Sequence, residues 1–350
     1  MRKKKVTMMD IASVVGVSQP TVSAIINGSD TIRVSTETKR KVLQIAEEMG
    51  YPLRRKIHHD DRSGSIALLI NSLNMHDPFI GAISAAQKRA WERNTVLTVF
   101  DYEDDMQFFE HVFKRVRRDI NCQSVIYAIN SPREITAVTV GDHQKLVYLN
   151  CFDRKEMRIP TIVPADFMGG FRATEHLLTQ GYRHIAMITG ESWSESSVQR
   201  VRGYRQAMIN SDCPINERLI APGNWSVRQS YLQVQTWLAA GEKIDAIFCA
   251  SDLMAVGVYQ AIQEHGRKIP EDIAVMGFDN QLLAGELRPP LSSIDLPYDE
   301  MGRMAVDYCL DGMIEGIAQT KIEGELFIRE STIYNNTAQR HSRARKNDEQ

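Results

Sequence analysis

Short apolar runs recur along residues 65–336, and amphipathic stretches separate them. The runs are IALLI, VLTVF, SVIYAI, KLVYL, HIAMIT, AIFCA and IAVMGF, and two of the amphipathic stretches are FIGAISAAQKRAWERN and DLMAVGVYQAIQEHGRK. Near-continuous apolar strands that alternate with helices indicate parallel sheets with helices on both faces. There are too many strands for one short sheet, so we expect two doubly wound α/β lobes. Ligands of such folds bind beyond the carboxyl ends of the strands, and a cleft between lobes fits a small molecule.

Charge is distributed unevenly along the 350 residues. Residues 1–56 hold 11 Lys and Arg against 5 Asp and Glu, whereas residues 57–350 hold 31 against 39. A small basic module joined to a larger acidic body is typical of nucleic-acid-binding proteins.

The first fifty residues predict three short helices, at residues 8–15, 18–27 and 35–49. Thr7, Ser18 and Ser35 are preferred N-cap residue types, and Gly16 supplies the left-handed residue that ends the first helix. Three helices with a tight turn between the first two form a helix-turn-helix, which is too small to hold much core of its own. Two interpretations are open, a DNA-reading module and a packing module with a solvated polar face. In the first, the second helix enters the major groove and directs four side chains at bases or backbone. These are Gln19, Pro20, Ser23 and Asn27.

The same residues carry a family resemblance. VTMMDIASVVGVSQPTVSAIING, followed by VSTETKRKVLQIAEEMGY, resembles the headpiece of the lactose-repressor (LacI) family of bacterial transcription regulators. The resemblance implies base reading from the start of the second helix and phosphate contacts from several hydroxyls. The implied phosphate contacts are Thr7, Ser18, Thr21, Ser35 and Thr38.

Three features depart from the family pattern. Ala24 stands where many relatives place an Arg, so one bidentate guanine contact is expected to be missing. The loop 29–33 is about two residues longer than in relatives, and Arg33 within it could reach a phosphate. The linker GYPLRRKIHHDDRSGS lacks the usual hinge-helix core. Arg54 and Arg55 could hold phosphates there, and the alternatives of a DNA-kinking hinge and a charged flexible linker stay open.

Neither catalysis nor a metal site is indicated. The sequence has no GxGxxG after a strand, no Walker loop and no HExxH, and GESWSES is not a nucleophile elbow. His58-His59 beside Asp60-Asp61 could bind a metal, although a solvated polar tract is the expected interpretation. The five cysteines are far apart, which predicts reduced core residues in a cytoplasmic protein. We also expect no export signal and no membrane span.

The resemblance extends over residues 65–332, through DFMGGFRATEHLLTQGYRHIAMITG, VQRVRGYRQAM, AIFCASDLMAVGVYQAI, IPEDIAVMGFDN and FIREST. That regulatory core is similar to periplasmic sugar-binding proteins. The resemblance implies an effector site at strand ends facing the cleft. The matching positions are Asp77, Phe79, Asn150, Ser194, Ser196, Arg200, Trp225, Ser251 and Asp279.

The chemistry of these residues is that of a sugar site. An indole can stack on the apolar face of a sugar, while Asp and Arg bind vicinal hydroxyls in pairs. Each residue also has an ordinary structural interpretation. Asp279 and Asp252 could be helix caps, Trp225 could be core, and Arg200 could pair with a structural carboxylate. A phosphate or carboxylate ligand on Arg200 is a further alternative.

The expected fold is a small all-α helix-turn-helix headpiece plus an α/β two-lobed core of the periplasmic-sugar-binding type, with doubly wound parallel sheets. The expected segments are a DNA-binding domain at 1–52, a linker at 53–63, a core at 64–336 and a disordered tail at 337–350. Three crossings would divide the core into one lobe of 64–163 with 296–324 and another of 164–295 with 325–336.

The sequence therefore predicts a sequence-specific DNA-binding transcriptional regulator, a repressor of carbohydrate-uptake or catabolism genes. A sugar-like effector between the lobes would control its affinity for double-stranded, pseudo-palindromic operator DNA. We expect a cytoplasmic homodimer with no cofactor, because the tail lacks the apolar heptads of a tetramer helix. Two other classes are considered, a periplasmic-type binding module and a sugar-modifying enzyme. The basic headpiece argues against the first, and the lack of a catalytic pair argues against the second.

Overall fold

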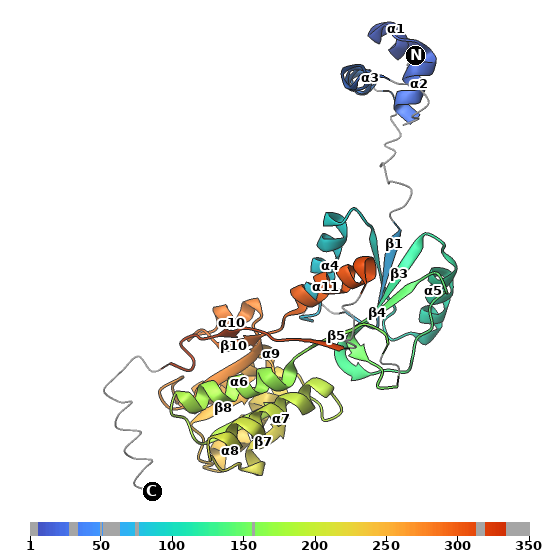
Figure 1. Cartoon of the computed structure of the whole chain (residues 1–350). Helices are drawn as coiled ribbons and strands as arrows, with labels where there is room; N and C mark the ends of the chain where they lie inside the picture. The colour runs from blue at the N-terminus through green and yellow to red at the C-terminus, as the bar shows by residue number, and fades with distance from the viewer. Residues whose placement is uncertain are drawn as a thin grey trace. The chain divides into compact units, whose positions relative to one another are not determined.

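The computed structural model describes residues 6–27, 34–49, 51, 64–73, 77–155, 158–312 and 319–333. The chain forms two compact units, residues 1–63 and residues 64–350 (Figure 1). Arg33, Arg54 and Arg55 lie outside the described residues, as do the linker 53–63 and the tail 337–350. Of Asn27 the structure describes the backbone but not the side chain.

The first unit consists of three helices around a small apolar core, and they are α1 (Met8–Val15), α2 (Gln19–Asn27) and α3 (Thr36–Glu48). Thr7 caps α1 in a reciprocal capping box with Asp10, and Gly16 ends it with a φ of 78°. Ile11, Val22 and Val42, one from each helix, are fully buried against one another. The helix-turn-helix predicted from the apolar spacing and the caps is confirmed.

The first sheet of the second unit has the strand order β11-β5-β4-β3-β1-β2, and all its pairings are parallel. The strands are β1 (Ser65–Ile70), β2 (Leu97–Asp101), β3 (Cys122–Glu134), β4 (Lys145–Phe152), β5 (Thr161–Pro164) and β11 (Gln319–Ile322). Side chains of β1 alternate between the two faces: Ile66, Leu68 and Ile70 join one core cluster, and Ala67 and Leu69 join another. Helices α4 (Ile80–Glu92) and α11 (Tyr298–Asp311) cover the first face, and α5 (Met106–Arg118) covers the second (Figure 1).

The second sheet has the order β12-β10-β9-β8-β6-β7 and is parallel except for β12. Its strands are β6 (Ile185–Thr189), β7 (Ile220–Pro222), β8 (Ala246–Cys249), β9 (Ala274–Asp279), β10 (Ser292–Asp295) and β12 (Leu326–Phe327). The helices of this lobe are α6 (Asp166–Thr179), α7 (Glu195–Asn210), α8 (Val227–Ala239), α9 (Asp252–Glu264) and α10 (Leu282–Glu286), with a 3₁₀ turn η1 (Glu217–Leu219). Helix α6 packs on α7, and α8 packs on α9.

The seven apolar runs of the sequence form β1, β2, β3, β4, β6, β8 and β9, so the predicted two-lobed parallel α/β fold is confirmed. Within the described residues five further strands appear that the apolar runs did not indicate, namely β5, β7, β10, β11 and β12. They are two to four residues long, which is too short to give a periodic signal.

The chain crosses between the two sheets at three places, which the order of the strands defines. These are the connections from β5 to α6, from β10 to α11, and from β11 to β12. Backbone hydrogen bonds join neighbouring crossings: the Ala165 amide donates to the Ile322 carbonyl and the Asp295 amide donates to the Glu325 carbonyl. The crossings therefore run side by side, at the carboxyl ends of the strands of the first sheet.

One finding concerns membranes. Among the described residues no single helix has the length and hydropathy to span a bilayer. Helices α1 and α2 reach that threshold only when they are counted together across a 110° bend.

Helices α6 and α7 approach closely because glycines stand at their contact. A Cβ on Gly203 of α7 would lie 2.2 Å from the Phe167 carbonyl oxygen and 2.5 Å from the Phe171 amide nitrogen. Both atoms belong to the backbone of α6, which cannot move as a side chain could. The close contact between α6 and α7 therefore requires glycine at position 203.

We expect Gly203→Ala to lower the free energy of unfolding of the core by about 3 kcal/mol, because overpacking against backbone forces the helices apart. Gly285→Ala in α10 is the matched control, since a Cβ there meets no atom within 4 Å. The control should change the free energy by less than about 1 kcal/mol. Urea denaturation followed by circular dichroism measures both, and equal stabilities for the two variants would contradict this account of the helix contact.

Candidate functional site

A cavity of about 280 Å³ lies beyond the carboxyl ends of strands from both sheets. Its size is close to the lower end of the roughly 300–1,000 Å³ range of ligand pockets, so it fits a small molecule. The first lobe contributes Asp77, Pro78, Asn130, Ser131, Pro132, Leu296 and Tyr298; the second contributes Ser196, Arg200, Trp225, Ser251, Leu253, Asp279 and Gln281.

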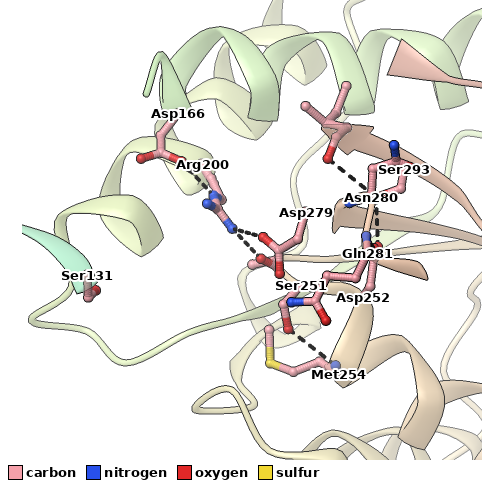
Figure 2. A network of polar contacts seen from close by, with 12 residues as sticks. Ser131, Asp166, Arg200, Ser251, Asp252, Met254, Asp279, Asn280, Gln281 and Ser293 are labelled. Atoms are coloured by element: carbon pink, nitrogen blue, oxygen red, sulfur yellow. Dashed lines mark hydrogen bonds and ion pairs between the residues drawn. The ribbon is translucent and has the colours of Figure 1, made fainter. Parts of the chain in front are cut away.

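Arg200 of α7 forms part of the cavity wall and is 3% exposed. Its Nε donates to Asp166 at 2.8 Å, and its Nη1 donates to the Ala250 carbonyl and to Asp279 at 3.5 Å (Figure 2). The guanidinium carbon also lies 3.6 Å from the centre of the Phe278 ring. Three segments of the chain, at Asp166, at Ala250 and at Phe278–Asp279, thus hold the Arg200 guanidinium in place without a ligand.

The charges around Arg200 perturb one another. Burial alone would lower the pKa of Arg200, but the carboxylates of Asp166 and Asp279 outweigh it and raise that pKa. Burial raises the pKa of Asp279 well above its ordinary value, and the Arg200 charge opposes this only in part. Burial also raises the pKa of Asp77 on the opposite lobe. The cavity is therefore lined by the Arg200 guanidinium and by the carboxyl groups of Asp279 and Asp77, while Asp166 binds the guanidinium from outside the lining.

Ser251 and Asp252 begin α9 in different roles. Ser251 is the N-cap, because its side chain accepts a hydrogen bond from the Met254 amide at 3.2 Å. Asp252 is fully buried and accepts hydrogen bonds from the Ser293 hydroxyl at 2.7 Å and the Gln281 amide at 2.8 Å (Figure 2). Asp252 thus ties α9 to the segment after β9, and the interpretation of Asp252 as a helix cap is wrong.

Trp225 forms an apolar face of the cavity. It has a φ of 56°, and its ring lies so close to Gly190 that a Cβ there would be 1.9 Å from the indole. The Arg200 guanidinium carbon is 5.8 Å from the centre of the ring. Trp225 is half-buried and keeps a surface toward the cavity, so a flat apolar platform stands beside the Arg200–Asp279 pair.

In the first lobe, Asn130 and Ser131 reach the cavity where the pairing of β3 is interrupted. The pairing of β3 with β4 shifts register between Ala128 and Arg133, so the intervening residues leave the regular ladder. Asn130 donates from its amide to Asp77 at 3.1 Å, and Asp77 also accepts from the Phe79 amide at 2.9 Å. The hydroxyl of Ser131 lies 3.5 Å from that of Ser194, which joins the two lobes at the rim.

Six of the nine residues expected at the effector site line the cavity, and they are Asp77, Ser196, Arg200, Trp225, Ser251 and Asp279. The other three, Phe79, Asn150 and Ser194, are fully buried and do not line it. Phe79 packs edge-on against Tyr298 at 5.2 Å, and Ser194 precedes the first turn of α7. These three side chains therefore lie behind the lining of the cavity.

Asn150 acts behind the cavity wall. Its amide group donates to the Ile129 and Asn130 carbonyls and to the Tyr298 hydroxyl. Its side-chain oxygen has no partner among the described residues. Asn150 therefore positions Tyr298 and the interrupted part of β3, both of which line the cavity.

Four polar lining residues were missed from the sequence: Asn130, Ser131, Gln281 and Tyr298. Pro132, shortly after the apolar run SVIYAI, was the one available signal, because a proline cannot donate a ladder hydrogen bond and so marks a bulge in a central strand. Tyr298 could not be predicted from local sequence. It follows β10 of the second sheet, and it lies at the cavity only because the chain returns to the first lobe at the second crossing.

The expected DNA-contacting residues of the first unit gather at helix N-termini. The Ser18 and Ser35 hydroxyls accept from the amides of Thr21 and Thr38, at 3.3 and 3.1 Å. Each serine also shares a hydrogen bond of 2.8 Å with the threonine hydroxyl. Helices α2 and α3 thus begin with the same Ser-x-x-Thr arrangement, and helix N-termini attract phosphate groups.

The remaining expected contacts differ in exposure. Thr7, Gln19 and Pro20 are exposed, whereas Ser23 is half-buried. Ala24 is only 8% exposed, so this position faces the interior of the unit more than its surroundings. Among the described residues no group of three or more His, Cys, Asp or Glu side chains could hold a metal ion.

Two family models match the chain. One, described as bacterial regulatory proteins of the lacI family, matches residues 7–52, and the other, a periplasmic binding protein-like domain, matches residues 174–332. The HTH-type transcriptional regulator AscG of Escherichia coli (strain K12) is 30% identical over 341 residues, which cover 93% of this chain and 98% of AscG. The ribose operon repressor of Haemophilus influenzae is 29% identical over 309 residues, covering 87% of this chain and 91% of the repressor.

Solved structures agree with these sequence matches. The lac repressor dimer bound to operator and the anti-inducer ONPF superposes with a TM-score of 0.73, at 24% identity, over 95% of this chain and all of that chain. The Escherichia coli transcriptional repressor ascG superposes with a TM-score of 0.64, at 26% identity, over 77% of this chain and all of that chain. The first likeness supports the fold, and the second also shares sequence.

Asp252→Asn tests the buried carboxyl group between α9 and β10. Burial raises the pKa of Asp252 to about 7, so the folded chain retains a proton that the unfolded chain releases above its ordinary pKa of 3.8. The folded state binds more protons over this range, and its stability therefore falls as the pH rises from about 4 to about 7. The variant has no such group, so we expect its unfolding free energy to lack this component. Urea denaturation from pH 4.5 to pH 8 measures it, and parallel curves for the two proteins would show that Asp252 does not titrate as described.

Proposed function

Because the chain belongs to the lacI family of bacterial regulatory proteins, and is thus a DNA-binding transcriptional regulator, we propose that it represses genes of carbohydrate uptake or catabolism. A small uncharged sugar in the cavity controls its affinity for operator DNA. The observation that carries this proposal is the indole of Trp225 beside the Arg200–Asp279 pair in one cavity wall. An apolar face and paired donors and acceptors together match a pyranose ring and its hydroxyls.

The charge of the cavity selects among possible ligands. Arg200 already shares its charge with Asp166 and Asp279, and Asp77 adds a further carboxyl group. A phosphate or carboxylate ligand would lose its hydration without gaining an unpaired cation, whereas neutral hydroxyls can bond to both partners. We therefore assign an unphosphorylated sugar. Relatives named as a ribose operon repressor and as a regulator CelR bound to cellobiose agree with this class.

The first unit provides the DNA contact in this proposal. Helix α2 enters the major groove with Gln19, Pro20, Ser23 and Asn27, and phosphates bind at the N-termini of α2 and α3. Thr7, Ser18, Thr21, Ser35 and Thr38 are the phosphate contacts, to which we add Arg33, Arg54 and Arg55 outside the described residues. A homodimer presents two such units to a pseudo-palindromic operator, and the solved lac repressor dimer bound to operator has the same fold.

The mechanism follows from the three crossings. A ligand that prefers one angle between the lobes shifts the population toward it, and the two linkers then change the spacing of the DNA-binding units. We retain the lobe ranges 64–163 with 296–324 and 164–295 with 325–336, because the strands of the first sheet lie at 65–164 and 319–322. The role needs no catalytic step and no cofactor, so we assign none, and we place the protein in the cytoplasm with its DNA.

Selection from genomic DNA tests the proposed function. The purified protein is incubated with fragmented DNA of the source organism at near-physiological salt, and the retained fragments are sequenced. We expect a shared palindrome beside sugar-transport or catabolic genes. Retention without any common motif would reject specific reading, and a motif beside unrelated genes would reject the carbohydrate assignment.

Gln19→Ala tests the base-reading helix in the same selection. Removal of one base-reading side chain costs about 1–3 kcal/mol, so we expect operator affinity to fall roughly 5- to 150-fold and the palindrome to become degenerate at one position in each half-site. Ser13→Ala, a substitution on the exposed side of α1, is the matched control. An unchanged motif with Gln19→Ala would place base reading elsewhere.

Asp279→Asn tests the sugar site. Unphosphorylated and phosphorylated sugars are first compared by thermal shift, and calorimetry then follows the sugar that stabilises the protein. Loss of charge-assisted hydrogen bonds should weaken binding about 10- to 100-fold. Because burial raises the pKa of Asp279 and sugar hydroxyls donate to its ionised form, wild-type affinity should rise with pH through that pKa, and the variant should lose this component of the rise.

The exposed Asp212→Asn, at a backbone φ of 51° that Asn tolerates, serves as the control for the sugar titration. It should bind the sugar as the wild type does. Stabilisation by sugar phosphates but by no unphosphorylated sugar would contradict the assigned ligand class.

A further inference from the structure

Helix α5 has two opposite faces of different chemistry. Phe109, Val112, Phe113 and Val116 are buried against the first sheet. Four of the five residues 114–118 are cations, and all four are exposed. They are Lys114, Arg115, Arg117 and Arg118, which together make up the α5 basic end. Positions three or four apart are neighbours on a helix, so the cations lie side by side and repel one another.

Within the described residues no carboxylate forms an ion pair with the cations of the α5 basic end. The end of α4, on the other face of the sheet, is different. Its Arg89 and Arg93 both bind Asp307 of α11, at 2.9 and 2.8 Å, and Arg93 also binds Asp311 at 2.7 Å. Both helices end at the same edge of the sheet. The cations at the end of α4 are paired with carboxylates, whereas those at the end of α5 are not, in the part of the chain that the structure describes.

The helix end does not need these cations for capping. The Asp119 amide donates to the Arg115 and Val116 carbonyls, and the Gln144 side-chain amide donates to the Val116 carbonyl at 2.8 Å. A ring nitrogen of His143 lies 3.2 Å from the Asp119 carbonyl oxygen. Backbone and side-chain amides thus cap the Arg115 and Val116 carbonyls, and none of the four cations is used for this.

The α5 basic end lies at the edge of the sheet where the linker enters the core. Strands β1 and β3 both begin there, and the Ser65 amide donates to the Asn121 carbonyl, three residues after the end of α5, at 2.7 Å. The cavity lies at the opposite edge, beyond the carboxyl ends of the same strands. Figure 1 shows α5 on the face of the sheet away from α4 and α11. The chain that carries the first unit therefore joins the core at the edge of the sheet where the α5 basic end lies.

We propose that the α5 basic end binds the phosphate backbone of DNA flanking the operator, as a second contact made by the core. The inference rests on the DNA binding of the first unit, to which it adds. Residues 52–63 connect the two units, and 12 residues span at most roughly 40 Å when fully extended. That limit keeps duplex outside the bound half-site within reach of the core. Clustered exposed cations without carboxylate partners are the groups that replace condensed counterions on DNA.

DNA is favoured over other polyanions because of this tether. An acidic protein or an anionic membrane also attracts four cations, but only DNA is already bound by a unit that is covalently joined to the core at this edge. The chain after the first unit is acidic even with these four cations included, since residues 57–350 hold 39 Asp and Glu against 31 Lys and Arg. A local basic surface on an acidic body confines the contact to one place and orients the core.

The test compares two four-fold variants of the full chain. In one, Lys114, Arg115, Arg117 and Arg118 are changed to Gln, which keeps helix propensity and the side-chain stems. In the matched control, Arg218, Arg228, Arg267 and Lys268, exposed residues of the other lobe, are changed to Gln. Binding to a 20-bp and a 60-bp duplex, each centred on the selected operator, is measured by fluorescence anisotropy from 50 to 300 mM salt. Thermal unfolding of each variant checks that it folds.

We expect the α5 variant to bind the 60-bp duplex at least 10-fold more weakly than the wild type at 100 mM salt. Its log–log salt slope should be smaller by about two or more, because each phosphate that the protein neutralises adds about 0.9 to the slope. The 20-bp duplex should bind all three proteins equally, which shows that the first unit still functions. The double variant Arg117→Gln, Arg118→Gln should reduce the slope by about half as much.

Three results would overturn the proposal. Equal affinities of the α5 variant and the control for the 60-bp duplex would show that the core makes no DNA contact. Equal losses on both duplexes would mean that the substitutions act through the first unit. Retention of the wild type, but not the α5 variant, on vesicles with 30% phosphatidylserine, with DNA binding unchanged, would assign the surface to a membrane.

Discussion

The buried guanidinium of Arg200 is the constraint on which the rest of the ligand cavity depends. A charge that is 3% exposed is strongly unfavourable unless carboxylates and carbonyls surround it. Asp166, Asp279 and the Ala250 carbonyl satisfy it, and they bring the start of α6, the end of β9 and the segment after β8 to one point. Phe278 covers the guanidinium, and Gly170 and Gly203 allow α6 and α7 to approach closely enough for the pair to form. The wall that faces a ligand is therefore rigid before the ligand arrives, and binding does not have to order it.

The same ion pair connects the cavity with the crossings between the lobes. Asp166 is the first residue of α6 and follows the end of β5 at Pro164, so the carboxylate that neutralises Arg200 is attached to the segment where the chain passes from one lobe to the other. Asp77 and Asn130 face this wall from the first lobe, and Ser131 lies within 3.5 Å of Ser194. In the proposed mechanism a sugar that bonds to groups of both lobes favours one angle between them. In the same mechanism the DNA-binding units respond to that angle through their linkers.

Much of the architecture could be predicted from the sequence because it depends on local pattern. Apolar runs indicated seven strands, and cap residues such as Thr7 and Gly16 set the limits of α1. The strands of two to four residues were missed, since so short a segment shows no period. Arg200 and Asp279 were found through family resemblance. Arg200 pairs with the carboxylates of Asp166 and Asp279, and both Arg200 and Asp279 also line the cavity. Phe79 and Asn150 were expected at the effector site but do not line the cavity, because both side chains pack against Tyr298. Tyr298 itself follows β10 in the chain yet belongs to the first lobe, a relation that no local pattern contains.

The central claim is that occupation of the cavity and occupation of the operator are coupled. It is tested most directly by the dissociation constant for operator DNA, measured with and without a saturating concentration of the sugar that binds the wild-type cavity. Coupling between sites in regulators of this kind amounts to about 1–3 kcal/mol, so the account predicts a change of roughly 5- to 150-fold in that constant, in either direction. An operator affinity that stays the same while calorimetry shows the cavity fully occupied would contradict it.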